Sequence, residues 1–377
     1  MLNLLHIIPT YKPAFGYGGT ITSISLLCEN LVIHGGCQVT VAATNANVRK
    51  DLPVHSRTPV NVEGVEVYYF RRITPDHSQL SPSLLWWLWR NARKFDAIHI
   101  HSWWNLTVMF STFVCVLRGV KPVLAPRGML SSFTIKGRFK PLFQRFIGKW
   151  LQKRTFLHAT SEQERTECLA LIPDWASENL PNLLKIPIVF NSATGVQSNT
   201  FRLLFFSRIH EKKGLEILFE ALAKVPFNWS LSIAGDGEMD YIEQLKTLSE
   251  RLKIGSKIAW LGWIDAQNST SFFQTHDLMV LPSHNENFAN VVIESLSVGT
   301  PVLVSNQVGL SDYVLEKNLG WVCEITVLSV LEKLTEANAQ TVLRESILER
   351  SPNQIRKDFD PSVLILKYLE MYKKVQK

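Results

Sequence analysis

The sequence predicts an α/β fold with two domains, each built on a doubly wound parallel sheet. The chain has 377 residues, which is too many for one ordinary hydrophobic core and indicates two domains. Short apolar runs alternate along it with segments of helical spacing, as in strands that are connected through helices. Polar and charged motifs follow several of these runs, where the carboxyl ends of parallel strands commonly hold ligands.

Composition and charge narrow the class of protein. Hydrophobic residues make up 46% of the chain and charged residues 19%, which is typical of a globular protein, and the formal net charge is +7. A mild basic excess suits a phosphate-bearing ligand, an anionic membrane surface or nucleic acid equally well. No RNA-recognition, zinc-finger or KH signature accompanies the charge, so we do not expect nucleic acid as a partner.

The cysteines and the apolar segments indicate a cytoplasmic protein. The five cysteines are scattered and lack metal-ligand spacing, so we expect buried thiols in a reducing compartment. The N-terminus has no basic segment or cleavage site and is predicted to be a first strand. Ala97–Leu117 is uncharged and long enough to span a bilayer, but its polar residues favour a buried strand and helix. Any membrane contact would then be peripheral, on the inner face of the cytoplasmic membrane.

The first domain is predicted to contain six strands: Leu2–Ile8, Val39–Ala43, Val65–Phe70, Asp96–His101, Pro122–Pro126 and Phe156–Ser161. Helices are predicted at Ile21–His34, at Pro82–Lys94 and from Glu162. Gly18 and Gly19 stand at the first strand-to-helix turn, where backbone N–H groups can face an anion. The turn is not Gly-x-Gly-x-x-Gly, and Asn45 replaces the acidic residue of a nicotinamide site, so no such cofactor is expected.

Lys136–Arg154 has the pattern of a basic amphipathic helix, because apolar residues recur at steps of three and four between cations. Two interpretations remain open. The helix can pack on the sheet and leave a solvated basic face, or it can contact anionic lipid headgroups.

The second domain repeats the pattern after a polar linker at Asn191–Thr200. Strands are predicted at Phe201–Phe206, Leu231–Gly237, Ile258–Gly262, Asp277–Leu281 and Val302–Val304, and helices at Leu215–Val225, Tyr241–Leu252, Asp265–Thr275, Asn290–Val298 and Pro361–Lys377. The predicted division is therefore 1–190, a linker at 191–200, 201–360, and a final helix at 361–377.

Arg208 and Lys213 flank the first strand-to-helix turn of the second domain. A guanidinium, an ammonium and free backbone N–H groups at one turn form a plausible site for a pyrophosphate. The turn lacks the Gly-x4-Gly-Lys-Ser/Thr pattern of a P-loop.

Glu286 and Glu294 follow the strand that ends at Leu281. If a helix begins near Glu286, eight residues at 3.6 per turn bring both carboxylates to nearly the same face. Each carboxylate can accept two hydroxyl hydrogen bonds, which suits a polyhydroxylated ligand.

These motifs resemble those of the family 4 retaining glycosyltransferases. Glu286 and Glu294 match the Glu-x7-Glu motif of that family, Arg208 to Gly214 its Arg-x4-Lys-Gly motif, and Pro126-Arg-Gly-Met129 a segment of capsule and exopolysaccharide members. The resemblance implies the GT-B fold, with two Rossmann-like domains that face a central cleft and a final helix that returns to the first domain. The implied reaction moves a sugar from a UDP- or GDP-linked donor, with retention, to a glycan or polyprenyl-linked glycan of a surface polysaccharide.

The resemblance also implies roles for individual residues. Catalytic roles fall to Glu286, which contacts the transferred sugar, and to His101, Arg208 and Lys213. Donor contacts fall to Gly19, Gly262, Asn287, Phe288, Ala289 and Glu294, in addition to Arg208 and Lys213, with Glu294 on the ribose and Gly262 beside the nucleobase. Gly18 and Arg127 lie on the acceptor side. The family usually has glycine where this chain has Ala289.

No cofactor and no metal are expected. Because no Asp-x-Asp metal motif is recognised, Arg208, Lys213 and a helix N-terminus would stabilise the leaving diphosphate. Two other functions stay open, namely another GT-B enzyme such as a sugar-nucleotide epimerase, and a non-catalytic glycan-binding protein.

Overall fold

The structure is a computed structural model that describes residues 1–15, 18–47, 51–53, 58–135, 137, 139–187, 199–264 and 266–376. The chain forms two compact units. Unit 1 comprises Met1–Lys185 and Phe359–Lys377, and unit 2 comprises Ile186–Asp358. Most of the expected linker, 191–198, lies outside the described residues.

Unit 1 is built on an eight-stranded sheet with the order β3-β4-β2-β1-β5-β6-β7-β8. All neighbouring strands are parallel except β3, which is antiparallel to β4 at one edge. From β4 to β6 the sheet has the doubly wound order that reverses at β1 and β5. The strands are β1 Asn3–Ile8, β2 Gln38–Thr44, β3 Pro59–Val62, β4 Val65–Phe70, β5 Ala97–His101, β6 Val123–Ala125, β7 Phe156–Ala159 and β8 Ser177–Asn179.

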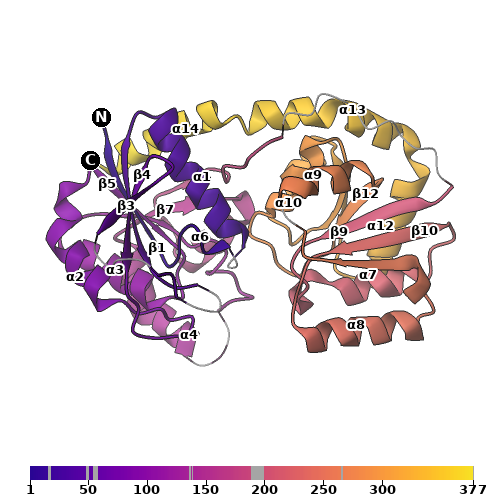
Figure 1. Cartoon of the computed structure of the whole chain (residues 1–377), viewed down its shortest axis with the longest axis horizontal. Coiled ribbons are helices and arrows are strands. Elements are labelled where there is room, and N and C mark those ends of the chain that lie inside the picture. The colour runs from indigo at the N-terminus through magenta and orange to yellow at the C-terminus, as the bar shows by residue number, and fades with distance from the viewer. Residues whose placement is uncertain are drawn as a thin grey trace. The chain divides into compact units, whose positions relative to one another are not determined.

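Helices cover the unit 1 sheet (Figure 1). They are α1 Gly19–Ile33, α2 Pro82–Asn91 with the 3-10 turn η2 Ala92–Lys94, α3 Leu106–Leu117, α4 Phe139–Phe143, the π-helical η3 Gln144–Gly148, α5 Lys149–Gln152, α6 Glu162–Leu171 and α14 Pro361–Val375. The expected helix Lys136–Arg154 is therefore divided into α4, η3 and α5, and Lys136 and Arg138 lie outside the described residues.

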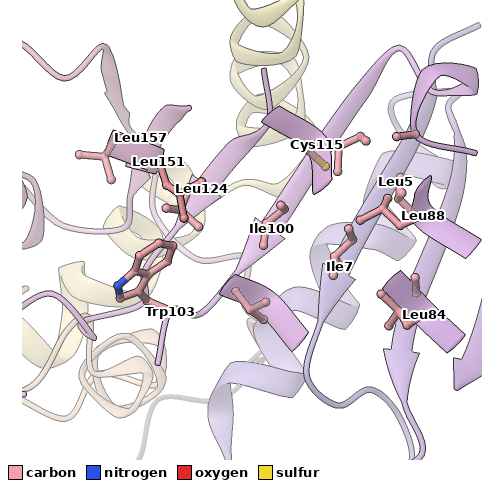
Figure 2. Packing of buried hydrophobic residues seen from close by; sticks show 14 of the residues in the cluster. Leu5, Ile7, Leu84, Leu88, Ile100, Trp103, Cys115, Leu124, Leu151 and Leu157 are labelled. Atoms are coloured by element: carbon pink, nitrogen blue, oxygen red, sulfur yellow. The ribbon is translucent and has the colours of Figure 1, made fainter. Parts of the chain in front are cut away.

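Because side chains alternate along each strand, the sheet of unit 1 has an apolar face and a face that carries histidines. Leu5 and Ile7 of β1, Ile100 of β5 and Leu157 of β7 share one face, where they pack against α2 and α3 in the hydrophobic core (Figure 2). The intervening residues point to the opposite face. This face carries His6 of β1, His99 and His101 of β5, and His158 of β7, all of them buried.

Helix α14 packs over the histidine-bearing face. Tyr372 shares a hydrogen bond of 2.9 Å with Nδ1 of His99, and Tyr368 lies 3.2 Å from Nε2 of His158. Both tyrosines are fully buried. The last helix of the chain is thus part of the core of unit 1.

Unit 2 has a six-stranded, wholly parallel sheet with the order β11-β10-β9-β12-β13-β14. Counted within the unit this is 3-2-1-4-5-6, the order of a Rossmann sheet. The strands are β9 Phe201–Phe206, β10 Trp229–Ala234, β11 Ile258–Gly262, β12 Leu278–Leu281, β13 Val302–Ser305 and β14 Gly320–Cys323. Two doubly wound α/β units confirm the predicted fold class.

The helices of unit 2 include two that the sequence pattern did not predict, α12 Val327–Ala339 and α13 Thr341–Asp358. The others are η4 Glu211–Lys213, α7 Leu215–Leu222, α8 Met239–Arg251, η5 Gly255–Lys257, α9 Ala266–Gln274, α10 Asn290–Ser297 and α11 Ser311–Glu316. Among the described residues, no helix has both the length and the apolar composition needed to cross a membrane. All five cysteines are buried thiols, as predicted.

Candidate functional site

The candidate site of unit 2 lies where its strand order reverses, between β9 and β12. At such a point the connections leave toward opposite faces of the sheet and open a crevice at the carboxyl ends of the strands. Lys213 follows β9, and Glu286 follows β12. Two predicted site residues from distant parts of the sequence are thus placed at the switch point.

Lys213 and Glu286 form an ion pair at this point, in which Nζ of Lys213 donates to Oε1 of Glu286. Lys212 adds a second cation, with its Nζ 3.3 Å from the same oxygen. Burial pushes the pKa of the Glu286 carboxyl upward, but the two lysines outweigh it and hold this pKa below its usual value. Glu286 is therefore a carboxylate, ready to accept hydrogen bonds.

Burial lowers the pKa of the Lys213 ammonium, and Glu286 opposes that effect. The charges of Lys212 and Arg208 lower it further. Arg208, on the same loop as Lys213, is exposed. The two ammonium groups of Lys212 and Lys213 exceed the single charge of the Glu286 carboxylate, which leaves positive charge that can meet an anionic ligand.

Backbone contacts hold the loops that carry this ion pair. The N–H of His284 donates to the carbonyl of Lys212 at 2.7 Å, which ties the loop after β12 to the loop after β9. Gly214 allows the close approach, because a Cβ there would lie 2.3 Å from the carbonyl oxygen of Pro282. Glu286 is held on its other side by hydrogen bonds to Gln307 and Gly309, at 3.0 and 2.8 Å.

Glu294 lies on α10, which corrects one expectation. The helix begins at Asn290 rather than near Glu286, because Glu286 forms a β-bridge with Val308 and Ala289 is in the left-handed conformation, with φ 66°. The two carboxylates therefore do not share a helix face. Desolvation raises the pKa of Glu294 to about 7, so this carboxyl is poised to change its protonation near neutral pH.

The other residues predicted for the donor are held mainly through their backbone. Phe288 and Ala289 are buried, so their side chains face the protein. The left-handed φ of Ala289 explains why glycine suits this position, since a Cβ there carries strain. Gly262 ends β11 at φ 67°, and its carbonyl accepts a hydrogen bond of 2.8 Å from Gly235. Asn287 is half-buried beside Glu286 in the same loop.

Unit 1 brings two other predicted residues together. Nη2 of Arg127 donates to Nδ1 of His101 at 3.3 Å, and Nη1 of Arg127 donates to Oδ1 of Asn182. His101 is fully buried at the end of β5. Arg127 has a left-handed φ of 57°, and Ser102, which follows His101, has φ 85°. Strained backbone of this kind persists only where its surroundings fix it.

The four buried histidines form two hydrogen-bonded chains. Because Arg127 only donates, His101 carries its proton on Nε2 and gives it to Nδ1 of His6 at 3.0 Å. Nε2 of His158 donates to the carbonyl of Leu180 at 2.9 Å, so its Nδ1 accepts from His99 at 3.1 Å. Burial lowers the pKa of all four imidazoles. The rings are neutral.

His6, His99 and His101 have ring nitrogens within 4.8 Å of one another. Each ring already shares hydrogen bonds, and the buried guanidinium of Arg127 disfavours a second cation beside them. His101 helps to hold Arg127 in place through their hydrogen bond. We assign no metal to the histidine cluster.

Gly18 and Gly19 occupy the predicted turn. Gly18 precedes α1 with a φ of 92°, a conformation that glycine adopts without strain, and Gly19 is the first residue of the helix. No side chain caps the N-terminus of α1. Gly16 and Tyr17 lie outside the described residues.

Some site residues were missed from the sequence. Lys212 was not predicted as a site residue, although it directly precedes Lys213 in the sequence. The loop Gln307–Gly309 was missed because its contribution is made by backbone groups. His6 and His158 could have been found from the strand alternation that places them on the face of His101.

One Asp-x-Asp pair does occur away from the site, at Asp358 and Asp360. Asp358 accepts hydrogen bonds from Tyr313 at 2.9 Å and from Gln354 at 2.8 Å. Asp360 caps α14 by accepting from the N–H of Ser362 at 2.8 Å. Both carboxylates are occupied by helix contacts.

Comparisons with known proteins agree with the fold. The family described as "Glycosyl transferases group 1" matches residues 190–353, and the "Glycosyl transferase 4-like domain" matches residues 18–177. An uncharacterized glycosyltransferase of Methanocaldococcus jannaschii, MJ1607, is 34% identical over 139 residues, which are 36% of this chain and 35% of that protein. The chain thus spans about a third of the length of that relative.

Two further similarities extend over the whole chain. An uncharacterized 41.2 kDa protein in the cps region of Klebsiella pneumoniae is 22% identical over 397 residues, with 99% of each chain covered. The crystal structure of Anabaena Alr3699/HepE in complex with UDP and glucose has a TM-score of 0.76 and 17% identity, and the match covers 99% of this chain and 100% of that chain. The chain therefore belongs to the group 1 glycosyltransferases, family 4, and has their GT-B fold.

Proposed function

We propose that this glycosyltransferase moves a sugar from a nucleoside diphosphate sugar to a glycan or polyprenyl-linked glycan, with retention of configuration. The observation that carries the proposal is the ion pair between Lys213 and Glu286 at the switch point of unit 2, with the exposed Arg208 on the loop that carries Lys213. Cations next to a carboxylate suit a ligand that joins a diphosphate to a polyhydroxylated sugar.

The proposed chemistry assigns each charge a task. As the bond between the sugar and the diphosphate breaks, negative charge develops on the leaving phosphate oxygen. Arg208 and Lys213 stabilise that charge, and the N-terminus of α7 adds its dipole. Glu286 accepts hydrogen bonds from sugar hydroxyls and orients the ring. Glu294 binds the ribose hydroxyls.

The proposed biological setting is surface polysaccharide synthesis at the cytoplasmic face of the membrane, with the protein peripherally attached. The relative encoded in the cps region of Klebsiella pneumoniae supports this setting, because its match covers 99% of both chains. The donor nucleotide is UDP or GDP, and the complex of Anabaena Alr3699/HepE with UDP and glucose favours testing UDP first.

A panel of nucleotide sugars tests the proposal. The protein is mixed with UDP- and GDP-linked hexoses, and its melting temperature is recorded, since a ligand that binds the native state stabilises it. The donors that raise this temperature are then incubated with bacterial lipid-linked glycan extracts, and the released nucleoside diphosphate is measured. Release that depends on the acceptor and is lost in Glu286→Gln supports glycosyl transfer. Binding without any acceptor-dependent release would favour a glycan- or nucleotide-binding protein instead.

A further inference from the structure

The segment formed by α4, η3 and α5 leaves several of its apolar side chains exposed. Gln144, Gly148 and Gln152 are buried, and Nε2 of Gln144 donates to Oε1 of Gln152 at 2.5 Å. Phe146 and Ile147 are instead 63% and 50% exposed. The expected packing of this helix on unit 1 is seen in part: Leu151 and Phe143 pack with the hydrophobic core, and the polar glutamine pair also lies on the buried side.

Helix α3 extends this exposed apolar surface. Phe110, Phe113 and Leu117 are exposed at helical spacing, although α3 has buried residues on its other side. The ring of Phe113 lies 6.2 Å from that of Trp150 on α5, so exposed aromatic residues of the two helices meet at this contact. We define the α3–α5 face by six exposed residues: Phe110, Phe113, Leu142, Phe146, Ile147 and Trp150.

Helix α2 adds two exposed tryptophans next to α3 (Figure 1). The guanidinium of Arg90 lies 3.7 Å from the ring centre of Trp86, and that of Arg118 lies 5.1 Å from the ring centre of Trp89. Arg118 follows α3, so this contact joins the end of α3 to α2. Tryptophan is enriched in the parts of proteins that lie at membrane–water interfaces.

The charge around the α3–α5 face has one sign. The sequence contains no Asp or Glu from Ala97 to Ser161, a stretch that includes α3, α4, η3 and α5. Arg145, Lys149 and Lys153 are exposed among the apolar residues. Cations that surround an apolar patch complement a surface that is negatively charged outside and apolar beneath.

We propose that the α3–α5 face docks on an anionic lipid bilayer, with Leu142, Phe146 and Ile147 inserted at the boundary between headgroups and acyl chains. A second copy of the chain fits this face poorly, because a symmetric contact would oppose like charges. Lysine is also depleted in the cores of protein interfaces. This proposal adds a docking surface to the proposed function. It relies on the proposed function only in taking the acceptor to be membrane-bound.

Vesicle sedimentation tests the docking. Vesicles of phosphatidylglycerol and phosphatidylethanolamine are compared with neutral phosphatidylcholine vesicles, at low salt and at about 0.5 M salt, where charge attraction is screened. The wild-type protein should bind the anionic vesicles and keep a residual affinity at high salt. The variant Leu142→Ser/Phe146→Ser/Ile147→Ser should bind at least tenfold more weakly at low salt and lose the residual binding, because the apolar contribution is gone.

A charge variant separates the two contributions. Arg145→Ser/Lys149→Ser/Lys153→Ser should weaken binding by more than tenfold at low salt, at about fivefold per cation, and change it little at high salt. The matched control is Met239→Ser/Leu328→Ser/Val342→Ser, which removes three exposed apolar side chains from unit 2 and should bind like the wild type. The melting temperature and the affinity for UDP of each variant show whether it is folded.

The outcomes distinguish the docking surface from the proposed function. Vesicle binding that survives both triple variants, or no vesicle binding by a wild-type protein that binds UDP, would overturn the docking surface alone. Self-association in centrifugation that the apolar variant abolishes, without vesicle binding, would assign the face to an interface between copies and also overturn it. Vesicle binding that follows the predictions in a protein that binds no nucleotide sugar would support the docking surface and contradict the proposed function.

Discussion

Nζ of Lys213 donates a hydrogen bond to Oε1 of Glu286 and so joins the loops that follow β9 and β12. These are the two strands between which the order of the unit 2 sheet reverses. An ammonium with three N–H groups uses one on Glu286 and can offer others to a phosphate. The pair therefore links the proposed sites of the sugar and of the diphosphate through one side chain.

Glu286→Gln should separate donor binding from turnover. We expect the affinity for UDP to stay within about threefold of the wild type, because the amide keeps the shape of the loop and the nucleotide does not reach the sugar position. Turnover with the full donor should fall by about a hundredfold or more, since the charged acceptor for the sugar hydroxyls is lost. Calorimetry and a steady-state assay measure the two effects. A variant with weaker UDP binding and unchanged turnover would reverse the assignment.

Glu294 should make nucleotide binding depend on pH. Its pKa is raised to about 7, and ribose hydroxyls that donate to it favour the ionised form. Binding then releases a proton, so the affinity for UDP should rise as the pH increases from about 6 to 8 and level off above that range. Glu294→Gln should bind UDP more weakly at pH 8 and lose this part of the pH dependence. The phosphate of UDP also titrates in this range and affects the wild type and Glu294→Gln alike. The test is therefore the difference between the calorimetric affinities of the two proteins across the pH range. Identical profiles would show that Glu294 does not contact the nucleotide.

The transfer reaction should not need a divalent metal. Lys212 and Lys213 supply positive charge next to Glu286, and the carboxylates of Asp358 and Asp360 are held by helix contacts. An assay in excess EDTA should therefore give at least half of the rate measured with magnesium. A complete loss of activity that magnesium or manganese restores would contradict this prediction.

The buried histidines should make unit 1 unstable in acid. Burial lowers the pKa of His6 and His158 from 6.5 to about 3, so below pH 6.5 the unfolded chain binds protons that the folded chain does not. Stability is thus full above pH 6.5 and falls as the pH drops, by at most about 1.4 kcal/mol per pH unit for each histidine. Denaturant titrations that follow tryptophan fluorescence measure this slope. His6→Gln should reduce it by about one proton, while the exposed His34→Gln should leave it unchanged. A slope that is the same in all three proteins would contradict the neutral cluster.

The strands of the central sheets were the easiest part to predict. Strands such as Leu278–Leu281 and Val302–Ser305 are buried on both faces of the sheet. Each therefore appears in the sequence as a continuous apolar run, which can be recognised without knowing the neighbouring strands. The edge strands β3 and β8 were missed because their residues are mostly exposed and carry no apolar run. Helix α13 was missed because its mean composition is polar and it contains Pro352.

The geometry around the predicted site residues did not follow from their spacing in the sequence. The spacing of Glu286 and Glu294 indicated one helix face, whereas the left-handed Ala289 and the bridge to Val308 keep Glu286 in a loop. Such features depend on contacts with β13 and its following loop, which are distant in sequence. For the same reason Lys136–Arg154 was read as a normal amphipathic helix. Its buried side includes the pair Gln144 and Gln152, and several of its apolar side chains are exposed.

The affinity of Arg208→Ala for UDP tests most directly whether the switch point of unit 2 binds a nucleoside diphosphate. Arg208 is exposed and takes part in no ion pair among the described residues, so its removal should leave the melting temperature unchanged. The loss of one charge-assisted hydrogen bond, worth about 1.5–3 kcal/mol, should weaken UDP binding by tenfold or more. Lys213→Ala should weaken it at least as much, and the exposed Arg251→Ala on α8 is the matched control. Calorimetric titration that gives the wild-type affinity for both Arg208→Ala and Lys213→Ala would contradict the proposed site.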